Sequence, residues 1–248
     1  MTGEPGERPL LSIVIPAYNE AARLPNPLQQ VADFVADQPY RAEVIVVNNR
    51  STDATPEIAR AFAAGRRGFE VLDEPRPGKG AAVKTGMLAG QGDFLFICDA
   101  DLSMPIAEVN KFLPPVLDAY DVAIASREGE GAQRIGEPEY RHLMGRVFNF
   151  IVRVLAIPGV QDTQCGFKVF RRDVARDVFP LATIDGWAFD VEVLFIALRR
   201  GSRLVEVPIT WIYREQSRVH PVRDSINMLV EVLRVRWNGW RGRYRRDA

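Results

Sequence analysis

Two aspartates separated by one residue are the best candidates for chemistry in this sequence. Asp99 and Asp101 directly follow the apolar run Asp93–Cys98, which is typical of a buried strand. Two carboxylates at positions i and i+2 of a strand end can converge on one hard cation, and such cations share oxygen ligands with substrate phosphates. A polar turn that closes a strand is the alternative interpretation. We expect Asp99 and Asp101 to bind Mg²⁺ or Mn²⁺.

A second polar segment, Ile15–Glu20, follows the first apolar run of the chain. Tyr18 offers a stacking face there, and Glu20 offers an acceptor for a base or ribose. An ordinary strand-to-helix turn with Asn19 as the helix cap explains the same residues. The segment contains no G-x-G-x-x-G and no G-x-x-x-x-G-K-[ST] pattern, so neither a dinucleotide fingerprint nor a P-loop is expected.

Two further segments carry polar residues at the ends of apolar runs. Asn48–Asp53 consists of residue types that favour turns and helix caps, so a turn explains this segment without any ligand. Pro77–Gly80 precedes a helical pattern; its glycines let a backbone approach a ligand, and Lys79 can reach a phosphate. A simple turn explains Pro77–Gly80 equally well.

The elements that must position these segments alternate between strands and helices. Short apolar runs predict strands at Ser12–Pro16, Glu43–Val47, Phe69–Leu72, Asp93–Cys98 and Val122–Ala125. Helical patterns lie between them, at Ala21–Ala36, Thr55–Ala64, Ala81–Ala89 and Ile106–Ala119. This alternation predicts βαβ units in a mostly parallel sheet. Ligands then gather at the carboxyl ends of the strands, where all four polar segments lie.

The second half of the chain is organised differently. Arg127–Pro138 is rich in Gly and Glu and predicts a long mobile loop. Tyr140–Ala156 and Val222–Trp240 are amphipathic helical patterns with arginines beside an apolar stripe. In the second pattern the stripe consists of Ile226, Leu229, Val230, Leu233, Trp237 and Trp240. The intervening segments predict a strand at Phe167–Phe170, a helix at Ala188–Arg199 and a strand at Leu204–Tyr213 that Pro208 interrupts.

The composition is that of a globular protein. The chain has 248 residues, of which 47% are hydrophobic and 26% charged, and it has only two cysteines, too few for a disulfide scaffold. No apolar run reaches the roughly 18 residues that a membrane span needs. The net charge is zero, but the segment Arg199–Ala248 holds twelve arginines and five acidic residues. This asymmetry predicts a basic C-terminal tail with an anionic partner; we do not expect that partner to be a nucleic acid.

In their order and spacing, the segments PAYNE, NNRSTD, GKGAAV and CDADLS resemble the family 2 inverting glycosyltransferases of the GT-A fold. DTQCGFKVF and WAFDVE further resemble the dolichyl-phosphate glucose and mannose synthase branch, and the glucose synthases more closely. The resemblance implies an α/β fold with a mostly parallel sheet flanked by helices and a C-terminal amphipathic helical extension. We expect a disordered tail at residues 1–9, a catalytic domain at 10–215 and a basic helix and tail at 216–248.

The resemblance also implies roles for single residues. Asp99 and Asp101 would hold the metal and the donor diphosphate, and Arg127 and Arg141 would bind the phosphate of the acceptor. The remaining donor contacts would come from Pro16, Tyr18, Glu20, Asn49, Ser217 and Arg218. We add Lys79 to the donor contacts because its place before a helix lets it reach a phosphate. Where mannose synthases often have Gln, this chain has Ser103, which favours UDP-glucose over GDP-mannose as the donor.

The implied reaction moves a hexose, glucose in this interpretation, from a nucleotide sugar to dolichyl or another polyprenyl phosphate. A phosphate monoester has a second pKa of about 6, so this acceptor is already an ionised nucleophile near neutral pH and needs no strong base. Asp190 and Glu192 remain carboxylate candidates for catalysis or for holding the sugar; a capped, solvated helix start is the alternative. We expect the protein to be cytoplasmic and peripheral on the inner face of the cell membrane, held by its basic amphipathic helices on anionic lipid.

Two other functions stay open. A family 2 enzyme with a soluble or protein-bound hydroxyl acceptor would keep the donor site but would need a general base, such as Asp190. A nucleotide-sugar-binding protein without catalysis is the other alternative, because Asn48, Asn49 and Arg50 stand where the family usually has two acids and a glycine.

Overall fold

The centre of the molecule is a seven-stranded mixed sheet. The computed structural model describes residues 8–213 and 221–245, with side chains of the last helix described from Ile226. The strands are β1 Leu11–Ala17, β2 Ala42–Asn48, β3 Phe69–Asp73, β4 Phe94–Ile97, β5 Val122–Ser126, β7 Lys168–Arg171 and β8 Leu204–Pro208. Their order is β3-β2-β1-β4-β7-β5-β8, and only β7 runs antiparallel to its neighbours. The predicted α/β fold with a mostly parallel sheet is confirmed.

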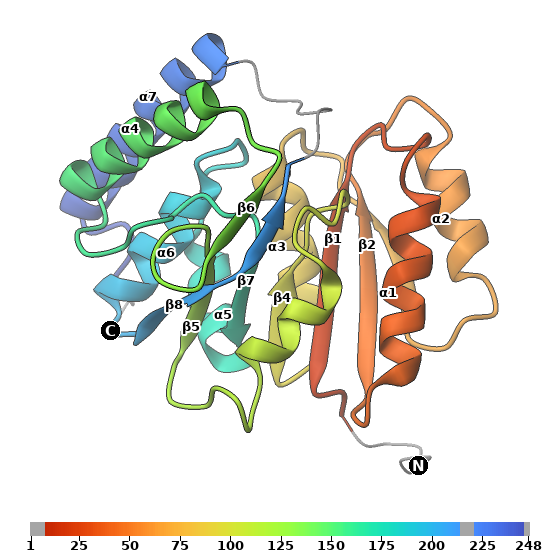
Figure 1. The fold of residues 1–248 in the computed structure, drawn as a ribbon. Helices are drawn as coiled ribbons and strands as arrows, with labels where there is room; N and C mark the ends of the chain where they lie inside the picture. Colours follow the sequence, from red (N-terminus) through yellow and green to blue (C-terminus); the bar gives the residue numbers. More distant parts are fainter. Residues whose placement is uncertain (1–7, 214–220, 246–248) are drawn as a thin grey trace.

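Helices cover both faces of this sheet, so the domain has three layers (Figure 1). Successive side chains of a strand point to opposite faces. In β1, Val14 therefore packs into the core under α3, α5 and α6, whereas Ile13 and Ile15 pack into the core under α1 and α2. The helices are α1 Pro25–Asp37, α2 Thr55–Ala63, α3 Lys79–Ala89, α5 Arg172–Val178 and α6 Phe189–Arg199.

Two predicted helices begin or end elsewhere. The pattern at Ile106–Ala119 forms only the short 3₁₀ helix η1, Ile106–Phe112, because Pro114 and Pro115 lack the amide hydrogens that continue a helix. The helix predicted from Ala21, α1, begins at Pro25. No side chain provides a cap hydrogen bond at the N-terminus of this helix. Asn19 is therefore not the cap of α1. Helix α5 and the following 3₁₀ helix η2 (Phe179–Leu181) were not predicted.

The segment predicted as a mobile loop, Arg127–Pro138, contains the strand β6, Gln133–Ile135. It pairs in parallel with β9, Thr210–Ile212. As the sequence predicted, Pro208 ends the preceding strand, β8, and β9 forms beyond it. Trp211 lies on β9 with its ring close to the Arg127 guanidinium, and Tyr213 directly follows β9.

The two amphipathic helices, α4 (Glu139–Leu155) and α7 (Pro221–Trp240), lie side by side at one end of the molecule (Figure 1). In α7, Val232 and Val235 are fully buried in the core. Its predicted apolar stripe, apart from the half-buried Leu229, instead faces outward, and α4 adds further exposed apolar side chains. The exposed residues are Tyr140, Leu143, Met144, Val147, Phe150, Val154, Ile226, Val230, Leu233, Trp237 and Trp240. We call these the α4/α7 apolar surface.

In α4 a polar residue is buried on the side of the helix that faces the protein. Asn149 is buried there together with Val152. Among the described residues, no helix is long and apolar enough to cross a membrane.

Candidate active site

A cleft of about 1100 Å³ opens at the carboxyl ends of the strands. It is lined by ten of the predicted site residues. These residues are Pro16, Tyr18, Glu20, Asn49, Lys79, Asp99, Asp101, Arg127, Arg141 and Asp190. Ser217 and Arg218 lie outside the described residues. Seven separate segments of the sequence thus meet around one cavity.

The loops after β1 and β2 are locked to each other by hydrogen bonds. The amide of Thr52 donates to the Asn19 side-chain oxygen (2.7 Å), and the amide of Asn19 donates to the Ser51 hydroxyl (3.0 Å). The amide of Glu20 donates to the Thr55 hydroxyl at 2.7 Å. Asn19 adopts a positive φ of 52° at this junction. The locked pair of loops forms one wall of the cleft, on which Tyr18 is half exposed.

Glu20 and Asn49, two predicted donor contacts, also bond to the protein itself. The Glu20 carboxylate accepts hydrogen bonds from the Arg23 guanidinium, one of them 2.6 Å long. The Asn49 amide donates to the Arg76 carbonyl (2.6 Å) and accepts from the Gly78 amide (2.9 Å). Asn49 therefore shapes the loop that leads into α3 and so helps to place Lys79.

Gly78 shows why this loop needs glycine. Its φ is +123°, and a Cβ there would lie 2.0 Å from the Asp185 carbonyl oxygen. The amide of Gly80 donates to the same oxygen at 2.8 Å. The start of α3 is therefore pressed against the segment before α6, and Lys79 reaches from it into the cleft.

Asp99 and Asp101 follow the fully buried strand β4 and face the cleft. Asp99 Oδ1 lies 2.5 Å from the Lys79 ammonium, and Asp101 Oδ1 accepts the amide of Ser103 at 2.9 Å. Within the described residues, no group of three or more His, Cys, Asp or Glu side chains gathers as a metal cluster. Two carboxylates fit a hard cation that completes its shell with substrate phosphate and water, and they do not fit a closed structural metal site.

A buried lysine that the sequence patterns did not reveal lies below these carboxylates. Lys168 in β7 is fully buried, and its ammonium donates to Asp190 Oδ1 and to the Cys165 carbonyl, each at 2.5 Å. Burial raises the pKa of Asp190, and Lys168 and Lys79 oppose that rise. Asp190 is almost fully buried, so it does not start a solvated helix. A lysine within the apolar strand GFKVF was the sequence feature that could have revealed it.

Lys79 is partly buried, and its neighbours favour the charged form. Burial alone would lower the pKa of its ammonium, but the carboxylates of Asp99, Asp190 and Asp101 raise it to about 12. The rings of Trp187 and Phe189 lie 5.7 and 5.9 Å from the ammonium nitrogen.

Glu192, the other carboxylate candidate, does not line the cleft. Its oxygens accept the amides of Thr183 (2.7 Å) and Ile184 (2.8 Å) and the hydroxyl of Tyr244 (2.7 Å). Glu192 therefore ties the C-terminal segment to the segment before α6.

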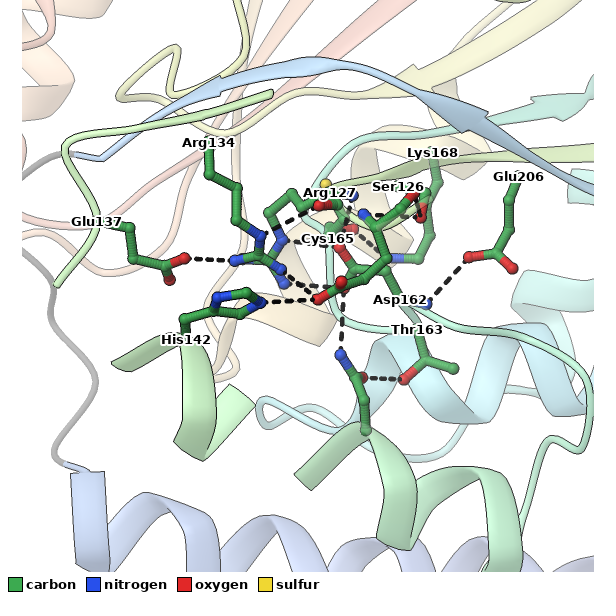
Figure 2. Close-up of polar contacts among 12 residues, drawn as sticks. Ser126, Arg127, Arg134, Glu137, His142, Asp162, Thr163, Cys165, Lys168 and Glu206 are labelled. Atoms are coloured by element: carbon green, nitrogen blue, oxygen red, sulfur yellow. Dashed lines mark hydrogen bonds and ion pairs between the residues drawn. The ribbon is translucent and has the colours of Figure 1, made fainter. Parts of the chain in front are cut away.

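At the other end of the cleft, a buried carboxylate holds Arg127 (Figure 2). Nε and Nη2 of Arg127 donate to the two oxygens of Asp162 at 2.7 and 2.8 Å, and the Arg127 amide donates to Oδ2 at 3.0 Å. Asn149 of α4 lies 3.4 Å from Asp162 Oδ1. Burial alone would raise the pKa of Asp162, but the Arg127 guanidinium lowers this pKa to about 2. Asp162 begins the segment DTQCGFKVF, yet no local pattern assigned this residue a role.

Arg134, on β6, completes this ionic network (Figure 2). Its guanidinium pairs with Glu128 at 2.7 Å and Glu137 at 2.5 Å, and its Nε donates to the Arg127 carbonyl at 3.1 Å. These contacts fix the position of the predicted loop Arg127–Pro138 in this structure.

The two arginines predicted to bind the acceptor lie at this end of the cleft, over neighbouring aromatic rings. The Arg127 guanidinium lies 5.3 Å from the centre of the Trp211 ring, and that of Arg141 lies 5.3 Å from the centre of the Tyr213 ring. The cleft is thus lined by Asp99, Asp101 and Lys79 and also by Arg127 and Arg141.

Comparisons with known proteins show which proteins this chain resembles. Residues 12–179 match the family described as Glycosyl transferase family 2. The chain is 30% identical over 242 residues to the dolichyl-phosphate beta-glucosyltransferase of Dictyostelium discoideum, covering 92% of this chain and 74% of that protein. It is 31% identical over 251 residues to the human protein of the same name, covering 95% of this chain and 77% of that protein.

The fold is similar to that of solved glycosyltransferases. Glucosyl-3-phosphoglycerate synthase from Mycobacterium tuberculosis, crystallised with Mn²⁺, UDP and phosphoglyceric acid, matches with a TM-score of 0.65 at 20% identity, covering 96% of this chain and 79% of that chain. The same enzyme was also crystallised with Mg²⁺ and UDP.

Proposed function

The chain belongs to glycosyl transferase family 2, in the dolichyl-phosphate glucose synthase branch, and from this premise we propose that it transfers glucose from UDP-glucose to a polyprenyl phosphate of the dolichyl type. The observation that carries the proposal is that one cleft is lined by both sets of charged residues. We assign Asp99 and Asp101 to a donor end of this cleft and Arg127 and Arg141 to an acceptor end. A cleft with both ends can bring two anionic substrates together.

At the donor end, Asp99 and Asp101 would hold Mg²⁺ or Mn²⁺. When bound, the cation neutralises charge on the leaving diphosphate. Tyr18, Glu20 and Asn49 lie on the wall assigned to the base and ribose, and Pro16 lies beside them. Lys79 is placed to reach the diphosphate, and we propose Ser217 and Arg218 as further contacts to it.

At the acceptor end, Arg127 and Arg141 orient the acceptor phosphate. A guanidinium donates two parallel hydrogen bonds to a phosphate, which fixes its direction as well as its place. A phosphate oxygen attacks the anomeric carbon of glucose, a new carbon–oxygen bond forms, and the bond to UDP breaks with its electron pair leaving on UDP. The configuration at that carbon inverts, and no side chain has to remove a proton from the nucleophile.

Two observations support UDP-glucose over GDP-mannose. The matched relatives are named glucosyltransferases, and the similar structures contain UDP. Ser103 lines the cleft next to the carboxylate pair, where mannose synthases often carry a longer side chain.

The α4/α7 apolar surface supports a peripheral position on a membrane, which we propose to be the inner face of the cell membrane. Trp237 and Trp240 contact each other there, with ring centres 5.4 Å apart, and Arg241 lies beside Trp237. Apolar side chains flanked by arginines are typical of helices that lie in the headgroup layer. The surface also continues into the cleft, because Met144 and Phe148 of α4 and Met228 of α7 line it. A lipid tail can follow that path to Arg141.

A hydroxyl acceptor is the alternative and would need a general base. Asp190 is the carboxylate whose raised pKa suits that task, but its Oδ1 accepts a hydrogen bond from the fully buried Lys168. This contact favours a phosphate acceptor. A binding protein without catalysis is disfavoured by the intact Asp99 and Asp101 pair.

A substrate panel tests the proposed function. The purified protein is incubated with labelled UDP-glucose, UDP-galactose or GDP-mannose, with a short polyprenyl phosphate and with Mg²⁺, Mn²⁺ or chelator. We expect a lipid-linked product from UDP-glucose that requires the cation and fails to form with the unphosphorylated polyprenol. Transfer to the polyprenol, or to a sugar acceptor but not to the phosphate, would contradict the proposal.

A further inference from the structure

The ammonium of Lys79 contacts one carboxylate of the pair and is also near a carboxylate outside it. Its nitrogen lies 2.5 Å from Asp99 Oδ1, and Asp190 as well as Asp101 favours its charged form. The rings of Trp187 and Phe189 shelter the same ammonium. Lys79 therefore neutralises a carboxylate that a divalent cation would also need.

Asp190 is held in place whether or not Lys79 contacts it. The buried Lys168 donates to Asp190 Oδ1 at 2.5 Å and is itself anchored on the Cys165 carbonyl. A buried carboxylate without a partner would be costly. Asp190 therefore keeps a charged partner, Lys168, when Lys79 leaves Asp99.

The charges of this part of the site are close to balance in the protein alone. Lys79 and Lys168 oppose Asp99, Asp101 and Asp190. A divalent cation by itself turns this balance positive and competes directly with the ammonium for Asp99. A diphosphate that arrives with the cation restores the balance and offers the ammonium new oxygen partners.

We propose that Lys79 is a built-in competitor of the metal, which keeps cation affinity low until the donor diphosphate binds. The inference rests on the proposed donor site but not on the identity of the acceptor. It assigns Lys79 a positioning role that couples two ligands: the cation and the nucleotide diphosphate each bind more tightly when the other is present. Such coupling must be equal in both directions.

Mn²⁺ binding to the intact chain tests this without turnover. Electron paramagnetic resonance reports the free ion, and titrations are run with and without UDP. We expect UDP to strengthen Mn²⁺ binding to the wild-type protein by at least about tenfold, within the usual range of coupling between two sites. Lys79→Met should strengthen Mn²⁺ binding to the nucleotide-free protein by about tenfold and reduce the effect of UDP correspondingly.

Three comparisons separate this role from a purely structural ion pair. Lys79→Arg keeps the charge and should behave like the wild type. Lys111→Met removes an exposed lysine that pairs with Glu108 outside the cleft, and should leave both titrations unchanged. If Lys79→Met fails to fold by circular dichroism, Lys79→Gln provides the same neutral substitution with a polar end.

The proposal is overturned if the neutral variant binds Mn²⁺ no more tightly than the wild type in the absence of UDP, which is the outcome that a structural ion pair predicts. It is overturned equally if UDP has no effect on Mn²⁺ binding to the wild type. The substrate panel is a separate readout, so a wrong acceptor or sugar would leave this result intact.

Discussion

Gly166 lies against the carboxylate of Asp99 so closely that a Cβ at Gly166 would be 1.9 Å from Asp99 Oδ2. The antiparallel register of β4 and β7 explains the contact. Ile97 pairs with Lys168, so the residue two positions beyond β4 meets the residue two positions before β7. The segment before the antiparallel strand β7 thus packs against Asp99, the proposed metal ligand.

Gly166→Ala should therefore displace the Asp99 carboxylate. A misplacement of about 1 Å at a reacting centre can cost roughly 10²-fold in rate, and we expect a loss of that order in glucose transfer together with weaker Mn²⁺ binding. Initial rates and Mn²⁺ titrations measure both, and the thermal midpoint checks that the fold is kept. If the variant kept the wild-type rate and Mn²⁺ affinity, the position of Asp99 against Gly166 would not matter for metal binding or transfer.

Asp101→Ala should reduce turnover by at least about 10²-fold, the scale of a lost electrostatic stabiliser. Asp101 lines the cleft, and its described hydrogen bond comes from the amide of the nearby Ser103, so the protein should remain folded. Initial rates at saturating substrates are the measurement. Asp33→Ala, on the exposed face of α1, is the matched control and should keep full activity. Full activity of Asp101→Ala in the presence of chelator would refute the metal role.

Arg141→Lys should impair the acceptor more than the donor. The substitution keeps the charge but removes the planar fork, and one lost charge-assisted hydrogen bond of about 1.5 kcal/mol corresponds to roughly tenfold in the apparent KM for polyprenyl phosphate. The KM for UDP-glucose should change little. Arg141 is the cleaner test of the two arginines, because Arg127 also compensates the buried Asp162. Equal changes in both KM values would argue against an acceptor role.

Asp162→Asn should change how stability depends on pH. The folded-state pKa of Asp162 is about 2, below the value of about 3.9 for an unfolded chain. Ionised Asp162 therefore stabilises the protein above about pH 4, and this contribution is lost as the pH falls from about 4 to 2. The variant leaves Arg127 uncompensated, so we expect it to unfold at lower temperature near neutral pH and to approach the wild type in acid. Thermal midpoints measured across this pH range are decisive, and a constant difference between the two proteins would exclude this linkage.

The α4/α7 apolar surface should hold the protein on anionic vesicles. Binding in a flotation assay should weaken with salt, since each basic residue near such a surface contributes about 1 kcal/mol. It should fall when Trp237 and Trp240 are both replaced by Glu, and when Arg241–Arg246 are removed. Val116→Glu alters an equally exposed apolar residue elsewhere and should have no effect. If the intact protein stays with the soluble fraction at low salt, the peripheral membrane position is wrong.

Local sequence patterns determined much of this protein. The strands β1 to β5 lie within one or two residues of their predicted ranges, because a buried strand between turn residues leaves a clear apolar run. Polar segments after successive parallel strands must meet at one sheet edge. That rule alone is enough to predict that Tyr18, Asn49, Lys79 and Asp99 share one cleft.

Only the tertiary structure decided which of the remaining charges act on that cleft. Lys168 and Asp162 carry no local pattern, and their partners, Asp190 and Arg127, lie 22 and 35 residues away. The same limit applies to the two amphipathic helices. A stripe shows that one face is apolar, but whether that face meets the core or the exterior depends on what packs against it. In α7, Val232 and Val235 are buried in the core, whereas most of the predicted stripe is exposed.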